Sequence, residues 1–414
     1  MINFRIRRLL RGTAPFAAGA AAVLLAAAIV LAPESSFKAS LAGLKLWWTI
    51  VFPALLPFLI LSEMLTASGF VHGIGVLLEP LMKRLFRLPG AGGWTLVLGL
   101  TAGFPAGAEG VMQLHRQGDL TDKEAGRLAS LVHYASPVTL LIVFGTAFLH
   151  SPAAGYVLLG LHWLSGLAAG GIASRLEGYG LRKAGPAPVT ASPASPKASL
   201  PGRIRQAAAE ARARDGRGFG KVLGESVSAA VQNLMIVGGY MIMFAVVINI
   251  AARLLPQLPP LLAAGLLEIH LGARAITSAA GADGAFLSSP LGPALLSAAA
   301  AWSGICAQLQ ALTVMKVAKV RFLPFAAVRL LHSGLAFVLT LLLWTPLMNL
   351  RSAVLPASAG LTPGTVEQDI SSAHGLWSFI PQLLGLQGLL ILLLLALSAA
   401  VRLFTWSGRP TGRT

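Results

Sequence analysis

The feature that constrains this chain most is a series of long apolar segments. They occupy residues 14–32, 46–62, 128–149, 226–252, 284–315 and 322–350. A helix needs roughly 20 apolar residues to cross the hydrocarbon core of a bilayer, and every backbone polar group in that core must be satisfied within the fold. The pattern therefore predicts an all-α, polytopic helical membrane protein of about eight helices.

One apolar segment, "LGLTAGFPAGAEG" at 98–110, is unsuited to a continuous helix. Gly103, Phe104, Pro105 and Gly107 stand in its middle, and Glu109 follows. Proline removes a backbone donor and glycine loosens a helix, so such a segment needs shelter from protein or water. We expect a broken or re-entrant segment that lines a solute path and offers backbone ligands between residues 103 and 107.

The formal net charge of +17 is concentrated in one stretch. Ten of the 32 lysines and arginines lie in residues 175–221, against three acidic residues, and this stretch contains "AGPAPVTASPASPKASLPG". The positive-inside bias makes residues 174–224 a basic cytoplasmic linker, and its composition predicts that 176–221 is largely unstructured. Contact with anionic lipid heads is expected there, whereas nucleic-acid binding is disfavoured.

The amino-terminal 40 residues allow two interpretations. A basic start, "MINFRIRRLLRG", precedes the apolar run 14–32, as in a cleavable secretory signal. That run is long for a signal core, and further spans follow it. We favour a retained membrane helix within residues 1–40, with its amino terminus in the cytoplasm.

The second half of the chain repeats features of the first in the same order. The tripeptide "LLE" occurs early in both halves, and "TAGFPAGAEG" places Gly103 opposite Gly304 in "AWSGICAQLQ". About 30 residues further on, "RLASLVH" ends at His133 and "RLLH" ends at His332. An internal repeat of this kind is typical of transporter folds.

The repeat divides the chain into five parts. They are the first helix in 1–40, a first repeat in 41–173, the basic linker in 174–224, a second repeat in 225–345, and a loop, last helix and tail in 346–414. If the second repeat is inverted, Lys316, Lys319 and Arg321 fall outside, against the positive-inside bias. A full crossing by 293–314 places them inside but breaks the match between repeats. We favour the inverted pair, and the side of the carboxyl terminus stays open.

Common enzyme motifs are missing from the sequence. "GRGFGKV" at 216–222 resembles a phosphate loop, but Asp215 replaces its first glycine and Val222 its Ser or Thr. Neither H-E-x-x-H nor G-x-S-x-G occurs, and Cys306 is the single cysteine. We therefore expect no enzyme, no metal and no cofactor.

The arrangement of several blocks resembles a known family. The blocks are "VFPALLPFLILSEML", "GFVHGIGVLLEPLMKRLFRLPG", "LGLTAGFPAGAEG" and "LHRQGDLTDKEAGRLASLVHYASP", followed later by "GLLEIHLGARAI" and "FAAVRLLHSGLAF". Together they are similar to the sporulation integral membrane proteins of the YlbJ type. The resemblance implies two nucleoside-recognition, or Gate, domains, a bacterial cytoplasmic membrane and a role in making the spore cortex. It carries over no ligand residues, and the domain name is no evidence of a nucleoside substrate.

Polar groups at membrane depth form the candidate site. Burying them in hydrocarbon is costly, so their presence there indicates a function. The substrate-path candidates are Gly103, Phe104, Pro105, Gly107, Glu109, His133, Ser303, Gly304, Gln308, Gln310 and His332.

Each group of candidates also has a structural interpretation. The spacing of Gly99, Gly103 and Gly107 suits close helix packing. His133 and His332 suit buried, hydrogen-bonded histidines. Glu63, Glu79 and Glu268 suit interfacial carboxylates at helix ends.

Glu109 has a further role to test. It lies six residues after the first break glycine, where the second repeat has Gln310. A carboxyl group in a cavity of low dielectric favours its neutral form, so Glu109 could load and release a proton. The alternative is an interfacial ion pair with Arg116 or Lys123.

Two classes of function fit these features. The first is a permease or channel-like transporter of a small polar solute. The second is a non-transporting membrane scaffold that organises envelope or spore-cortex assembly. The discriminating feature is whether the two breaks enclose a polar cavity, and a homo-oligomer is compatible with both.

Overall fold

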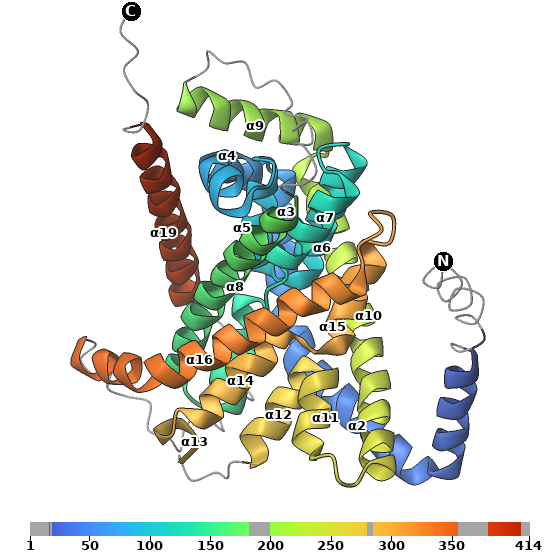
Figure 1. Ribbon diagram of the computed structural model, residues 1–414. Coiled ribbons are helices and arrows are strands. Elements are labelled where there is room, and N and C mark those ends of the chain that lie inside the picture. The colour runs from blue at the N-terminus through green and yellow to red at the C-terminus, as the bar shows by residue number, and fades with distance from the viewer. Residues whose placement is uncertain (1–15, 17–18, 182–198, 280–284, 355–379, 407–414) are drawn as a thin grey trace, which may run out of the picture.

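The computed structural model describes residues 16, 19–181, 199–279, 285–354 and 380–406. The regular secondary structure in these ranges is all helical, with no strand among them (Figure 1). Five helices in the described part are long and apolar enough to cross a membrane: Pro33–Ala67, Pro152–Leu176, Phe219–Leu254, Leu291–Val314 and Phe322–Asn349. The all-α membrane class is confirmed, although several expected spans are divided into shorter helices.

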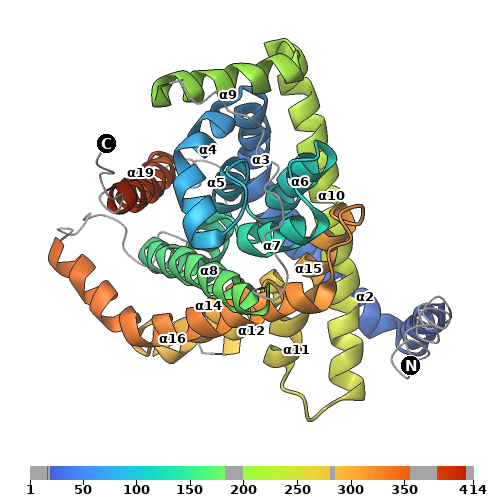
Figure 2. The same cartoon turned by 45° about the horizontal axis from the view of Figure 1, so that its top comes forward.

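The first half of the chain surrounds one short apolar helix, α5. Its elements are α2 (Pro33–Leu46), η1 (Trp47–Val51), α3 (Phe52–Ala67), α4 (Phe70–Leu81), η2 (Met82–Phe86), α5 (Gly92–Ala102), α6 (Phe104–Arg116), α7 (Asp122–Val132), η3 (Thr139–Phe148) and α8 (Pro152–Leu181), where η marks π-helical turns. Figure 2 shows α3, α4, α6 and α7 around α5. Every α5 residue from Gly92 to Leu100 is buried, which explains why this helix carries no charge.

Helices α5 and α6 form a hairpin that turns at Gly103. Gly103 adopts φ 91° and ψ −171°, a conformation that residues with a Cβ avoid. Gly99 and Gly107 face each other across the hairpin and both lie against the Val132 carbonyl of α7. The glycine spacing therefore allows close helix packing as well as the break.

The expected helix over 128–149 is wrong. A capping box between Thr121 and Glu124 starts α7, which ends at Val132, and residues 133–136 form a buried non-helical segment before the helical turn at 137–138 that leads into η3. Pro137 accounts for part of this break, because the residue before a proline avoids the α region.

The second half follows a different pattern of breaks. Its elements are α9 (Leu200–Asp215), α10 (Phe219–Leu254), α11 (Pro260–Leu267), α12 (Ile269–Ala279), α13 (Ala285–Ser288), α14 (Leu291–Trp302), α15 (Gly304–Val314), α16 (Phe322–Val354) and α19 (Ile380–Trp406). The chain breaks at Ser303 and Gly304, with φ of 67° and 73°, as the sequence predicts near Gly304. A second break falls at Glu268, which is extended between α11 and α12.

The prediction that 176–221 is largely unstructured is wrong for most of the described part. Helix α8 continues to Leu181 and α9 occupies Leu200–Asp215, while residues 182–198 lie outside the described residues. The stretch "RQAAAEARARD" consists mainly of strong helix formers, and Gln206 and Glu210 are bonded one turn apart along it. The Pro- and Ser-rich neighbourhood obscured this pattern.

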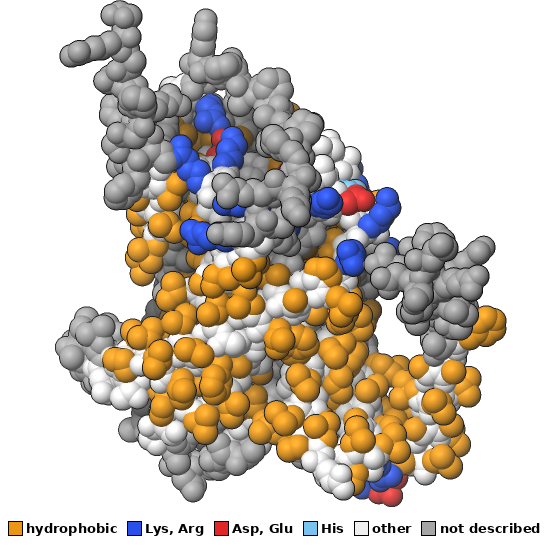
Figure 3. Space-filling model, viewed as in Figure 1, with side chains coloured by type: hydrophobic (Ala, Val, Ile, Leu, Met, Phe, Trp, Pro, Cys, Tyr) orange, Lys and Arg blue, Asp and Glu red, His pale blue; other side chains and the backbone are white. Residues whose placement is uncertain are grey.

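Most of the charged side chains visible in Figure 3 lie at one end of the molecule, with a smaller group at the opposite end. Figure 3 shows blue side chains at the upper end, where Figure 1 places α9 and α4, and a broad hydrophobic band below them. We call this the basic end. The band is the surface that a bilayer would cover.

Candidate functional site

Two helix breaks, one from each half of the chain, meet at His133. The ring of His133 stacks on Phe104, directly after the first break, with centroids 5.0 Å apart. His133 Nε2 lies 2.8 Å from the hydroxyl of Ser303, at the second break. Gly103 and Gly304 have other near neighbours: Ser136 lies against Gly103, and the backbone of Leu267 and Glu268 lies against Gly304. The breaks are therefore joined through His133 and not through the glycines themselves.

Arg329 of α16 fixes the broken end of α7. Its guanidinium donates to the backbone carbonyls of Ser130 and His133, and it is 1% exposed. The last carbonyls of a helix lack partners within the helix and carry partial negative charge. Arg329 satisfies two such groups from the other half of the chain, and no carboxylate of the described residues forms an ion pair with it.

Two more histidines complete this site. Nε2 of His332 lies 3.0 Å from the carbonyl oxygen of His162, and the two rings are 4.7 Å apart. The backbone N–H of Ala135 donates to Nε2 of His162 at 3.0 Å. We name the set His133, Tyr134, His162, Ser303, Arg329 and His332 the buried polar cluster.

The buried polar cluster keeps unused hydrogen-bonding capacity. Three of its atoms have no partner among the described residues: the Tyr134 hydroxyl, Nδ1 of His162 and Nε of Arg329. Because Nε2 of His162 accepts from Ala135, its Nδ1 carries the proton and is a free donor. Buried polar groups normally find partners, so these atoms suit a water molecule or a polar solute.

A second polar pair lies beside the break at Ser303 and Gly304. The carboxylate of Glu268 accepts from the backbone N–H of Leu271 at 2.7 Å and lies 2.9 Å from Nδ1 of His270. Glu268 and His270 are 2% and 3% exposed. The interpretation of Glu268 as an interfacial carboxylate is therefore wrong, since it caps the start of α12 inside the protein.

The remaining candidates lie around these breaks. Gln308 donates to the Trp302 carbonyl at 2.9 Å, and its own amide oxygen has no partner among the described residues. The amide of Gln310 lies 3.2 Å from the Cys306 sulfur. Pro105 and Gly107 stand in the first turns of α6.

Glu109 lies apart from the buried polar cluster. Its carboxylate accepts from the side chain of Asn233 at 3.2 Å. The structure thus gives it an amide partner on α10 in place of the ion pair with Arg116 or Lys123 that the sequence also allowed. Through Asn233 the carboxylate contacts the second half of the chain, so a change in its protonation would alter a contact between the two halves.

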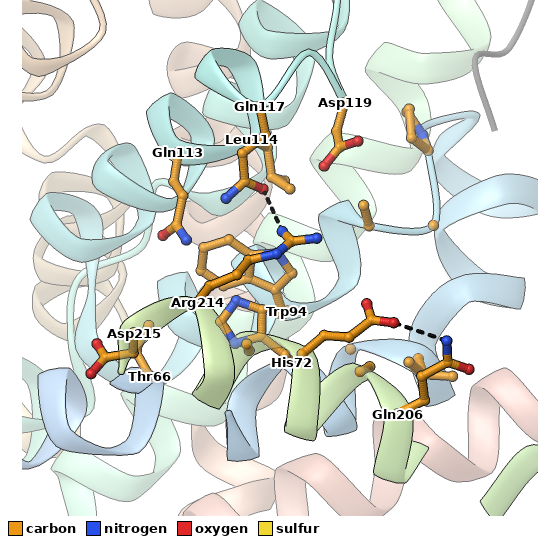
Figure 4. Close-up of a pocket in the computed structure, with 18 of the residues that line it drawn as sticks. Thr66, His72, Trp94, Gln113, Leu114, Gln117, Asp119, Gln206, Arg214 and Asp215 are labelled. Carbon is orange, nitrogen blue, oxygen red and sulfur yellow. Dashed lines mark hydrogen bonds between the residues drawn. The ribbon is translucent and has the colours of Figure 1, made fainter. Parts of the chain in front are cut away.

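A polar cavity of about 660 Å³ opens at the basic end, and we name it the vestibule. It lies between α3, α4, the outer ends of α5 and α6, and α9. Trp94 and His72 stack on its wall with ring centroids 4.5 Å apart, and Figure 4 shows Arg214 of α9 beside them. Burial and the nearby Arg214 guanidinium lower the pKa of His72 to about 4, so this histidine is neutral at pH 7.

The α5–α6 hairpin links the vestibule to the buried polar cluster. Trp94 at its start and Gln113 near its end line the vestibule, while Phe104 at its tip contacts His133. The hairpin thus enters and leaves on the basic side. The sequence did not predict the vestibule, because α9, expected to be unstructured, supplies much of its wall. It did not predict Arg329 either, although a charge within the apolar run 322–350 was an available signal.

The class of protein follows from these features: it is a polytopic helical membrane protein with broken helices. It has helices long enough to span a membrane, a short hairpin that turns inside the fold and a buried polar cluster at the tip of that hairpin. The chain belongs to the family of the sporulation integral membrane protein YlbJ. It is 34% identical to that protein of Bacillus subtilis (strain 168) over 345 residues, which cover 78% of this chain and 81% of the relative. The Gate family model, described as nucleoside recognition, matches residues 48–171. No solved structure matches.

Proposed function

We propose that this protein is a multi-pass permease or channel-like transporter of a small polar solute in the bacterial cytoplasmic membrane, and not an enzyme. The observation that carries the proposal is the meeting of two helix breaks on one buried polar cluster. Broken helices expose backbone groups and helix-end dipoles to a site inside the membrane, which is how many transporters bind solutes. The basic end faces the cytoplasm by the positive-inside bias.

The vestibule supports a path from the cytoplasm to the buried polar cluster. It is a polar cavity at the basic end, and the hairpin that forms part of its wall carries Phe104 to the cluster. Below it, the unpartnered atoms of Tyr134, His162 and Arg329 offer hydrogen bonds to a solute. In this proposal, the described conformation is one in which α9 forms a wall of the vestibule and the cluster is closed by its own contacts.

The relative's name links the proposal to spore formation. The matched protein is called a sporulation integral membrane protein, and we propose the same role for this chain, at the stage when the spore cortex is made. A permease would then supply or remove a solute that the developing spore requires. Anionic lipid heads at the basic end and a homo-oligomeric state belong to the same proposal.

The test is solute movement in proteoliposomes. Purified protein is reconstituted around a mixture of organic acids, amino acids, sugars and nucleosides, and mass spectrometry follows which solute leaves. Tyr134→Phe is the informative variant, because its hydroxyl has no partner to lose. We expect unchanged thermal stability and altered transport. If no solute leaves faster than from protein-free liposomes, the scaffold function replaces the permease.

A further inference from the structure

Helix α9 is held on the protein without a buried side chain. None of its residues from Leu200 to Asp215 is buried, whereas the neighbouring α4 buries five residues. Elements with little buried surface open at low free energy, well below global unfolding. The hydrophobic effect therefore contributes little to keeping α9 in place.

The contacts that do hold α9 are polar or involve small residues. Arg203 pairs with Glu79 of α4 at 2.7 Å, with both side chains partly exposed. A Cβ at Gly69 would lie 2.1 Å from the Ala208 carbonyl oxygen, so α9 rests directly on the backbone just before α4. Ion pairs of this exposure are weak and are screened by salt.

A three-residue link joins α9 to the spanning helix α10. Gly216 has φ 64° and closes α9, and Gly218 has no atom within 4 Å of where its Cβ would lie. Between them Arg217 pairs with Asp215 and, at 2.7 Å, with Glu225. Two glycines around one arginine make a hinge that a few ion pairs hold in a single position.

The face of α9 toward the vestibule is polar. Gln206, Glu210 and Arg214 follow each other at intervals of four and line the cavity. Gln206 donates to Glu210 at 2.8 Å and Arg214 donates to Gln117, just after α6, at 3.5 Å, as Figure 4 shows. Without α9 this side of the vestibule would be open.

We propose that α9 is a movable cover of the vestibule, which swings on the 216–218 link to admit or release solute on the basic side. The inference rests on the proposed permease function, because a cover controls passage only if solute passes. Its displacement breaks contacts of exposed or half-buried α9 residues and withdraws no buried α9 side chain from the core. Solute access is therefore regulated by the linker between the repeats and responds to ionic strength.

A disulfide between α4 and α9 tests the cover. A Cβ placed at Gly73 lies 3.6 Å from Cβ of Ala208, which is within the range for a disulfide. Gly73→Cys/Ala208→Cys is made in a Cys306→Ala background, and each single cysteine variant is the control. Oxidation should lower transport by at least about 10-fold, and a reductant should restore it, while the single variants are unaffected. Equal transport by the oxidised and reduced forms would show that α9 is a fixed wall.

Hydrogen exchange separates this inference from the permease proposal, because it needs no transport. Amides of 200–215 should exchange at least about 10-fold faster than those of α10, faster still in high salt, and should slow on oxidation of the cysteine pair. Exchange of α9 as slow as that of α10 would overturn the cover. If α9 exchanges as expected but no solute moves in liposomes, the permease proposal fails and the movable helix stands.

Discussion

Replacing Arg329 should destabilise the join between the two halves more than any surface charge does. Its guanidinium gives hydrogen bonds to the Ser130 and His133 carbonyls, both buried. In Arg329→Gln one short amide cannot reach both groups. Losing a charged donor costs about 1.5–3 kcal/mol per hydrogen bond, and relief of the buried charge returns part of that total. We expect a net loss of about 2–4 kcal/mol.

Cys306 offers a direct assay for this loss. It is the single cysteine of the chain and is 2% exposed, so a thiol-reactive fluorescent dye reports unfolding as the detergent-purified protein is heated. Since 1 kcal/mol shifts the midpoint of a domain of 150–250 residues by roughly 2–4 °C, we expect a midpoint lower by about 5–10 °C. Arg329→Lys keeps the charge without the fork and should lie between this variant and the parent.

The matched control is Arg321→Gln, which removes an exposed arginine just before the same helix. It should shift the midpoint by no more than about 1 °C, because exposed charges contribute little. Equal midpoints for the Arg329→Gln variant, the Arg321→Gln variant and the parent would refute the argument that Arg329 caps α7.

Three further changes test separate parts of the structure. Gly99→Ala places a Cβ 2.2 Å from an α7 carbonyl and should cost about 1–3 kcal/mol by overpacking, whereas Gly126→Ala meets open space and should be neutral or stabilising in the same dye assay. The hydrogen bond from Arg217 lowers the pKa of Asp215. The Asp215 carboxylate therefore stabilises the α9–α10 corner at neutral pH, and this stabilisation is lost as the pH falls from about 4 through the lowered pKa. Pepsin cleavage near residue 216 should rise in that window, and the rise should be absent in Asp215→Asn, which lacks the ion at every pH. Glu109→Gln should leave the protein folded but remove the pH dependence of transport, and transport with an unchanged pH profile would exclude proton coupling through Glu109.

The sequence predicted the helix breaks where the backbone itself carries the signal. Glycine and proline at 103–107 identify the hairpin turn, because their conformational limits are local. The break at 133–136 carried only the weaker signal of the proline that follows it, and the uninterrupted apolar run around it predicted a helix. Composition likewise needs no knowledge of distant contacts, and it predicted the membrane class and the concentration of positive charge at one end of the molecule.

The assembly of the site depends on contacts that local patterns do not contain. His133 was a candidate from its position in the repeat, but its contact with Ser303 spans 170 residues of sequence. Arg329 pairs with main-chain carbonyls almost 200 residues away. Helix α9 shows its helical pattern in its own residues, yet its place over the vestibule follows from Gly69, just before α4, and Gly73 within α4, which leave room for it.

The way Arg329 is recognised has a consequence for how this protein changes through evolution. Its partners are main-chain oxygens, which every amino acid at positions 130 and 133 would supply equally. No substitution at position 130 can compensate for loss of the arginine, and substitutions there need no answering change at 329. The link that Arg329 makes between the two halves should therefore leave no trace of paired substitutions at 130 and 329 among relatives, and it would be recognised there by an arginine that stays constant while residue 130 varies.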